Sequence, residues 1–119
     1  IHSIIDSLLG AMKKKDIGTF FPDNQKKYRN IRSTKMLKPI IKILNNNNFQ
    51  INNLDINLIC EQPKVSKYRD KIIKSLSNLL NIDKELINLK GKTVEKLGLI
   101  GKEKAIACEV ICSITEWKK

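Results

Sequence analysis

The sequence predicts an α/β (α+β) fold built around one β-sheet. In three segments, apolar residues recur at three- and four-residue spacing, which is typical of amphipathic helices. In a fourth segment the apolar residues Leu54, Ile56, Leu58 and Cys60 alternate with Asp55, Asn57 and Ile59, and this period of two is typical of a half-buried strand. The predicted order is helix, helix, strand, helix, strand, strand. That order favours a single layered domain over separate helical and all-β parts.

The first helix is predicted from the start of the chain to about Lys14. Its apolar residues have clean helical spacing: Ile1, Ile4, Ile5, Leu8, Leu9 and Met12. No capping residue and no initiating Met precede this helix, so we expect that upstream residues are missing. Gly and Pro then predict a loop over Asp16-Ile17-Gly18 and Phe21-Pro22-Asp23.

A second helix is predicted over residues 36–44. Pro39 lies inside this segment, so the helix either starts near Pro39 or is kinked there. The run of Asn residues from Asn45 to Asn48 is expected to end the helix in a loop. From residue 24 to residue 54, every charged side chain is basic.

The second half of the chain is predicted to supply the rest of the sheet. A half-buried strand covers residues 54–60, and a third helix carries its apolar face from Tyr68 to Leu80. A second strand follows at residues 87–92. The last strand, residues 105–115, is almost continuously apolar and is expected to be covered on both faces. We find no repeat and no boundary, so residues 1–119 are predicted to form one domain.

The composition limits the possible classes of function but does not identify one of them. The chain has 23 Lys and Arg against 12 Asp and Glu, a formal charge of +11. This charge favours an anionic partner: nucleic acid, an anionic membrane or a phosphorylated small molecule. A genome biased towards A and T would also produce this composition. The three cysteines have no zinc-ligand spacing and fit a reducing compartment, and no segment is long and apolar enough to span a membrane.

Two short segments have the chemistry of a phosphate site. Lys64 follows Pro63 at a strand-to-helix junction, where a cation and free N–H groups can hold an anion. The alternative is an ordinary helix start with an exposed Lys. Thr93 lies in Lys92-Thr93-Val94-Glu95, which combines a cation, a hydroxyl and a carboxylate; the alternative is that Thr93 caps a short helix.

Other polar residues allow two interpretations each. Asp16 and Asp23 place two carboxylates on one loop, where an Asp beside a Gly, as Asp16 is, could bind ribose hydroxyls; the alternative is that both simply belong to two common turns. His2 is the only histidine and is spaced to pair with Asp6 on the first helix. Glu109 lies in the apolar last strand and is expected at an interface between subunits.

Taken together and in order, these segments resemble the 2-C-methyl-D-erythritol 2,4-cyclodiphosphate synthase family over essentially the whole chain. The matching segments are His2 to Gly10, Asp16-Ile17-Gly18, Phe21-Pro22-Asp23, Pro63-Lys64, Thr93 to Gly98 and Ile106-Ala107-Cys108-Glu109. The resemblance implies a single mixed sheet with helices packed on one face, assembled as a homotrimer with active sites between subunits. It also implies that the N-terminal strand and metal-binding segment of the domain are missing.

The resemblance implies an enzyme, a phosphorus–oxygen lyase of the non-mevalonate isoprenoid pathway. Its substrate would be 4-diphosphocytidyl-2-C-methyl-D-erythritol 2-phosphate, which cyclises with release of CMP. Zn²⁺ and Mg²⁺ or Mn²⁺ would be the cofactors. His2 matches a zinc ligand, Glu95 the ligand of the second metal, and Thr93 the catalytic residue. The matching substrate contacts are Asp16, Ile17, Gly18, Phe21, Pro22, Asp23, Asn24, Gln25, Cys60, Glu61, Gln62, Pro63, Lys64, Val65, Ser66, Lys92, Val94, Leu99 and Lys102.

The sequence also departs from the family pattern. The Asp-x-His zinc ligands and the catalytic His-Ser of relatives would precede the first helix, so this chain alone is expected to lack full zinc binding and activity. Relatives often have Thr at positions 92 and 94, Phe for Leu99, Arg for Lys102, and a more acidic pair for Asn24-Gln25. The alternatives are an inactive trimeric relative or a basic RNA-binding module; we expect neither nucleic acid nor membrane as a partner. The expected location is a plastid, apicoplast-like, or the bacterial cytoplasm.

Overall fold

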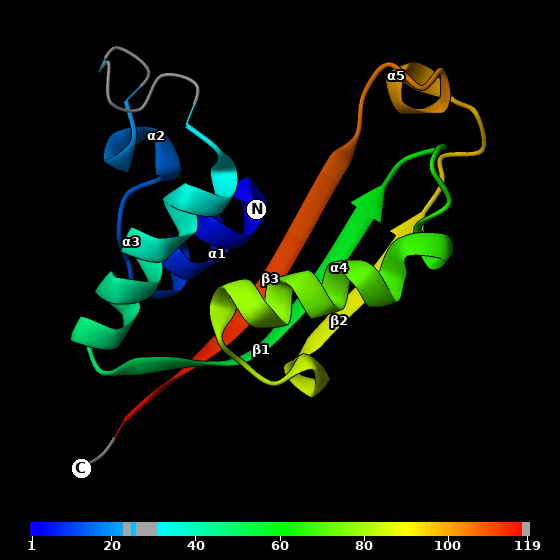
Figure 1. The fold of residues 1–119 in the computed structure, drawn as a ribbon. Helices are drawn as coiled ribbons and strands as arrows, with labels where there is room; N and C mark the ends of the chain where they lie inside the picture. Colours follow the sequence, from blue (N-terminus) through cyan, green and yellow to red (C-terminus); the bar gives the residue numbers. More distant parts are fainter. Residues whose placement is uncertain (23–24, 26–30, 118–119) are drawn as a thin grey trace. The chain divides into compact units, whose positions relative to one another are not determined.

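The computed structural model describes residues 1–22, 25 and 31–117. The chain divides into two compact units. One contains Ile1–Asn53 and the end of the chain from Cys112, and the other contains Leu54–Ile111. The fold class is as predicted: one mixed three-stranded sheet accompanied by helices (Figure 1).

The first unit is built on two helices, α1 (His2–Ala11) and α3 (Ser33–Asn46), which pack against each other. Their apolar faces form its core: Ile4, Ile5, Leu8, Leu9, Leu37, Ile40 and Leu44. Helix α1 ends three residues before the predicted Lys14, because Lys13 takes a left-handed backbone conformation with φ of 58°.

One expectation for this unit was wrong, and one of the two alternatives for Pro39 is excluded. The segment after Asp16, predicted as a loop, contains a one-turn helix, α2 (Ile17–Phe20). Of the two alternatives for Pro39, a helix start there is excluded, because Pro39 lies inside α3 with an exposed side chain; a kink at Pro39 remains a prediction. The Asn run does end α3 as predicted, with Asn47 as the C-cap and Asn48 at φ of 62°.

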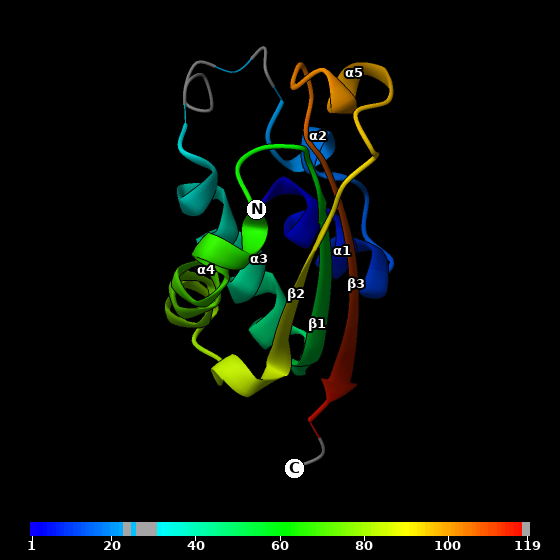
Figure 2. The same cartoon turned by 90° about the vertical axis from the view of Figure 1, so that its right-hand side faces the viewer.

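The sheet has the order β2-β1-β3. Strand β1 (Phe49–Ile59) starts five residues before its predicted position, whereas β2 (Ile87–Lys92) has the predicted bounds. These two strands are parallel, and their register pairs Leu54 with Ile87 and Ile59 with Lys92. Figure 2 shows β3 (Ala107–Glu116) running in the opposite direction.

Strand β3 was expected to be covered on both faces, and this is wrong for the described chain. Its residues alternate between half-buried and exposed, and none is fully buried. Ile111 is 73% exposed, and Glu109 lies on the same exposed row. A continuous apolar run can therefore mark a strand with one open face as well as a fully covered one.

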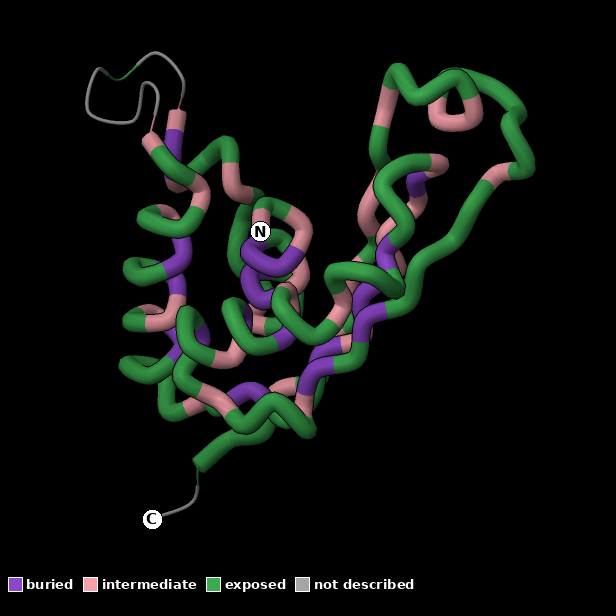
Figure 3. Tube along the Cα trace, turned by 45° about the vertical axis from the view of Figure 1, so that its right-hand side comes forward, coloured by how far each residue is buried: buried purple, intermediate pink, exposed green. Residues whose placement is uncertain are grey.

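Helix α4 (Val65–Leu80) connects β1 to β2 and packs on β2. Its buried face consists of Val65, Ile73, Leu76 and Leu80, and Figure 3 shows buried segments along the facing strands. The Arg69 side chain joins the two elements, because its Nε donates to Leu89 O at 3.0 Å and its Nη2 donates to Asn88 Oδ1 at 3.1 Å. A short turn, η2 (Lys84–Leu86), leads into β2. In the part of the chain that the structure describes, no helix is long and apolar enough to cross a membrane.

A polar cluster bridges the other side of β1 and β2. Lys90 Nζ lies 3.1 Å from Asp55 Oδ2, and Asn88 Nδ2 donates to Asp55 Oδ1 at 3.2 Å. The hydrogen bond from Lys90 is the main cause that lowers the pKa of the Asp55 carboxyl, although partial loss of solvent opposes it. Because both partners are solvent-accessible, this pair contributes little to stability.

We expect Asp55→Asn to lower the melting temperature slightly at pH 7. A carboxyl whose pKa is lowered by folding stabilises the folded state above its unfolded pKa, and this contribution is lost as the pH falls through the folded pKa. Melting curves of both proteins from pH 7 to pH 3 should therefore converge at the acidic end. A difference that stays constant with pH would contradict the role of the Asp55 charge.

Candidate functional site

A candidate site in the second unit lies where two parallel strands end. The backbone N–H of Cys60 donates to Lys92 O at 3.0 Å, which continues the pairing just past the end of β1. Helix α4 begins at Val65, only a short connection away. In sheets of this kind, ligands bind at the carboxyl ends of the strands, where helix N-termini also point.

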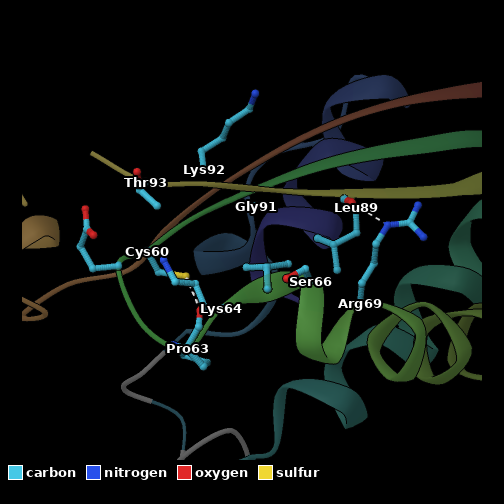
Figure 4. Close-up of a pocket in the computed structure, with 11 residues that line it drawn as sticks. Cys60, Pro63, Lys64, Ser66, Arg69, Leu89, Gly91, Lys92 and Thr93 are labelled. Atoms are coloured by element: carbon cyan, nitrogen blue, oxygen red, sulfur yellow. Dashed lines mark hydrogen bonds between the residues drawn. The ribbon is translucent and has the colours of Figure 1, made fainter. Parts of the chain in front are cut away.

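A pocket of about 220 Å³ occupies this position (Figure 4). Three elements line it: the connection after β1, the first turns of α4 and the end of β2. The lining residues are Cys60, Glu61, Pro63, Lys64, Val65, Ser66, Arg69, Leu89, Gly91, Lys92 and Thr93. Pockets that hold a whole small ligand have volumes of roughly 300–1,000 Å³, so this one has the size for part of a ligand.

Gly91 brings the helix start close to the strand. A Cβ atom built on Gly91 would lie 2.7 Å from Cβ and 2.9 Å from Cγ2 of Val65. A side chain at this position would therefore push α4 away from β2. The glycine lets the amino end of α4 lie directly against β2.

Basic groups outnumber acidic ones around the pocket. Lys64 is the N-cap of α4 and makes no side-chain cap bond within the described chain. The N–H of Lys67 already donates to Lys64 O at 3.2 Å, so of the first-turn N–H groups those of Val65 and Ser66 are left for another acceptor. The guanidinium of Arg69 is already bound to β2. Lys92 extends on the opposite side of the β2 ribbon from Lys64 and Ser66 (Figure 4). Lys64 and the helix amino end are thus the groups best placed to meet an anion.

Glu61 is the acidic residue of the lining, and its carboxylate is engaged. Its Oε1 accepts hydrogen bonds from the backbone N–H groups of Val94 and Lys96, each at 3.0 Å. The bond from Lys96 is the main cause that lowers the pKa of the Glu61 carboxyl. The bond from Val94 and the charges of Lys64 and Lys96 add to the effect, and partial loss of solvent opposes it. The Glu61 carboxylate is therefore kept ionised, and it is bound to the segment that follows β2.

The pocket brings together most residues of two segments that were predicted to form the site, residues 60–66 and 92–95. Eight of the predicted substrate or catalytic residues line the pocket: Cys60, Glu61, Pro63, Lys64, Val65, Ser66, Lys92 and Thr93. Gln62 does not line it, and the Gln62–Pro63 peptide bond is cis. Val94 adjoins the pocket through its hydrogen bond to Glu61, and Glu95 lies between the two residues, Val94 and Lys96, that donate to Glu61. The alternative that Thr93 caps a helix is wrong, because α5 (Gly98–Gly101) has Leu97 as its N-cap.

Leu99 and Lys102 lie at this short helix rather than at the pocket. Leu99 belongs to α5 and is 66% exposed, and Lys102 is the exposed C-cap. Figure 3 shows most of the connection between β2 and β3 as exposed. The role of Leu99 and Lys102 in substrate binding remains a prediction.

The remaining predicted residues belong to the first unit. Asp16 is the N-cap of α2: its Oδ1 accepts from the N–H and the hydroxyl of Thr19 at 3.1 and 2.9 Å. This is the ordinary structural role that the turn interpretation expects. Asp6 Oδ1 accepts from Ile17 N–H at 2.8 Å, so this carboxylate holds the start of α2.

The other candidates around α2 are placed as follows. Phe21 is buried, Gly18 and Gln25 are exposed, and Pro22 is half-buried. The predicted residues Asp23 and Asn24 lie outside the described residues.

The described residues alone do not form a metal site. Nowhere among residues 1–22, 25 and 31–117 do three His, Cys, Asp or Glu side chains gather as a metal would require. His2 and Glu95 are both exposed, and each offers one ligand. The metal roles of these two residues remain predictions.

Sequence reasoning missed three residues of the pocket. Gly91 carried a signal, since a glycine inside a strand often marks a close approach. Leu89 could have been placed on the same face of β2, because it is two residues from Gly91. Arg69 carried no signal, because its partners lie about twenty residues further along the chain.

Comparison with known proteins identifies the family. The YgbB family profile matches residues 1–115. A bifunctional enzyme IspD/IspF from Pelagibacter ubique is 52% identical over 114 residues, which are 96% of this chain and 31% of that protein. A 2-C-methyl-D-erythritol 2,4-cyclodiphosphate synthase, apicoplast, from Plasmodium falciparum is 50% identical over 107 residues, 90% of this chain and 45% of that protein. The chain thus spans less than half the length of these curated relatives.

The fold agrees with the sequence match. A solved structure described as IspF from Plasmodium falciparum in a CDP complex superposes with a TM-score of 0.88 at 44% identity. The match covers 98% of this chain and 70% of that one. With the profile spanning nearly every residue and the pocket lined by the matching segments, the chain belongs to the YgbB family, that of the 2-C-methyl-D-erythritol 2,4-cyclodiphosphate synthases.

Proposed function

We propose that the protein containing this chain is a cyclodiphosphate synthase. It would cyclise 4-diphosphocytidyl-2-C-methyl-D-erythritol 2-phosphate to the 2,4-cyclodiphosphate and release CMP. The observation that carries this proposal is the pocket itself, which joins Pro63-Lys64 to Lys92-Thr93 at the amino end of α4. The relative solved as a CDP complex supports a ligand with a cytidine diphosphate group.

The reaction asks the protein mainly for alignment and charge neutralisation. An oxygen of the 2-phosphate attacks the β-phosphorus, a new P–O bond forms, and the bond to the oxygen of the departing CMP breaks. Phosphoryl transfer of this kind depends on positioning and on stabilising the spread negative charge. Lys64 and the N–H groups of Val65 and Ser66 at the start of α4 would bind the diphosphate, and the Thr93 hydroxyl would lie beside it at the end of β2.

Metals and assembly are further parts of the proposal. We propose Zn²⁺ and Mg²⁺ or Mn²⁺ as cofactors, with one ligand each from His2 and Glu95. We also propose a homotrimer, which is supported by the exposed apolar residues on and beside β3: Ile106, Ile111 and Trp117. Both an apicoplast and bacteria occur among the sources of similar proteins, so either location is compatible.

The test is CMP release by the full-length gene product with Zn²⁺ and Mg²⁺. We expect CMP to appear in step with loss of the 2-phosphate monoester signal in ³¹P NMR. The matched control is the same diphosphocytidyl compound without its 2-phosphate, which lacks the attacking group and should bind without releasing CMP. Absence of CMP from the true substrate, together with absence of CDP binding, would overturn the proposal.

A further inference from the structure

The segment after β2 adopts a backbone that needs support. Glu95 and Lys96 both have positive φ values, 54° and 65°, and Gly98 follows at 65°. A residue with a Cβ atom pays roughly 1–2 kcal/mol for a left-handed conformation. Two such residues in succession persist only where other contacts hold them.

Glu61 supplies contacts on both sides of this bend. One carboxylate oxygen accepts the N–H of Val94 before Glu95 and the N–H of Lys96 after it, at 3.0 Å each. The donors are 33 and 35 residues away from Glu61 along the chain, so these bonds tie the end of β1 to the segment after β2. Hydrogen bonds to an ionised acceptor are about twice as strong as neutral ones.

We propose that Glu61 is a positioning residue that fixes Thr93 and Glu95 relative to the pocket, rather than a group that contacts substrate. This inference rests on the proposed function, because Thr93 and Glu95 are its candidate catalytic and metal-binding groups. The assignment differs from the one that the family resemblance implies, in which Glu61 belongs to the substrate-contact segment.

Electrostatics favours this assignment. A carboxylate turned towards a bound diphosphate would repel it, whereas one bound to two N–H groups has its charge directed to the backbone. The same geometry has a second consequence: the N–H groups of Val94 and Lys96 are occupied and do not serve as phosphate donors. Backbone donors for phosphate then come from the start of α4.

Two substitutions at Glu61 separate the effect of its hydrogen-bond acceptor from the effect of its negative charge. Glu61→Gln keeps an Oε1 atom that can accept both N–H groups, whereas Glu61→Ala removes the acceptor. Glu85→Ala is the matched control, because it deletes an exposed carboxylate in the same unit, away from the pocket. Each variant is made in the full-length protein. The readouts are amide exchange at Val94 and Lys96, the Kd for CDP, and kcat and KM for CMP release.

We expect Glu61→Ala to speed exchange of both amides roughly tenfold. It should lower kcat by roughly a hundredfold, the cost of a misplaced catalytic segment, with little change in the Kd for CDP. Glu61→Gln should restore most of both losses, and Glu85→Ala should match the wild type. Unchanged amide exchange in Glu61→Ala would overturn the proposal whether or not the protein makes CMP. So would faster exchange with an undiminished kcat, or a loss confined to CDP affinity. A wild type that releases no CMP would instead count against the proposed function, while the amide exchange still tests the contact.

Discussion

Gly101→Ala is expected to disorder the segment that carries the candidate catalytic residues. A Cβ atom at Gly101 would lie 2.0 Å from the carbonyl carbon of Lys96 and 2.6 Å from its Cα. Main-chain atoms cannot rotate away as a side chain does, so the backbone at Lys96 must shift. Because the N–H of Lys96 is one of the two donors to Glu61, that shift breaks the contact that holds the bend.

The expected cost is about 1–3 kcal/mol in the free energy of unfolding, as for other insertions into a tightly packed position. We expect a lower melting temperature, faster amide exchange from Val94 to Lys96, and a kcat for CMP release lowered by roughly a hundredfold. Thermal melts, amide exchange by NMR and the CMP assay would measure these effects.

Gly10→Ala is a suitable control for this substitution. Gly10 lies in α1, and a Cβ atom there meets nothing within 4 Å. Alanine in a helix is favoured over glycine by about 0.5–1 kcal/mol, so this variant should be as stable as the wild type or more so. If Gly101→Ala behaved like Gly10→Ala, the close packing of α5 on Lys96 would be contradicted.

The sequence predicted the elements that have a strong and long repeat. Helices α1 and α4 each bury an apolar face spaced over several turns, and β2 was found with its observed bounds. Helix α2 was missed because one turn is too short to establish a helical period. The first half of β1 was missed because its polar residues, among them Asn52 and Asn53, look like a continuation of the Asn-rich loop.

The site was predicted less completely, because several of its contacts join residues that are far apart in the sequence. The pocket residues after β1 were identified by their types and order, which the chain shows directly. The bonds of Glu61 to Val94 and Lys96, and the packing of Gly101 on Lys96, depend on how separate segments meet. Local pattern contains no information about those contacts, although they determine where Thr93 lies.

Thr93→Val is expected to have the largest effect on catalysis with the least effect on structure. Valine keeps the β-branched shape and the strand preference at the end of β2, and it removes only the hydroxyl. Thr93 is exposed, so no buried packing depends on it. We therefore expect an unchanged melting temperature and an unchanged Kd for CDP.

If the Thr93 hydroxyl stabilises the charge that develops during cyclisation, its loss should reduce kcat by roughly 10²–10³-fold, as for other donors of this kind. A fall in kcat with a constant KM would indicate an interaction made only in the transition state. Thr34→Val, at an exposed position of α3, is the matched control and should retain full activity. A rise in KM with an undiminished kcat would make Thr93 a binding residue instead, and the charge stabilisation would then fall to Lys64 and the amino end of α4.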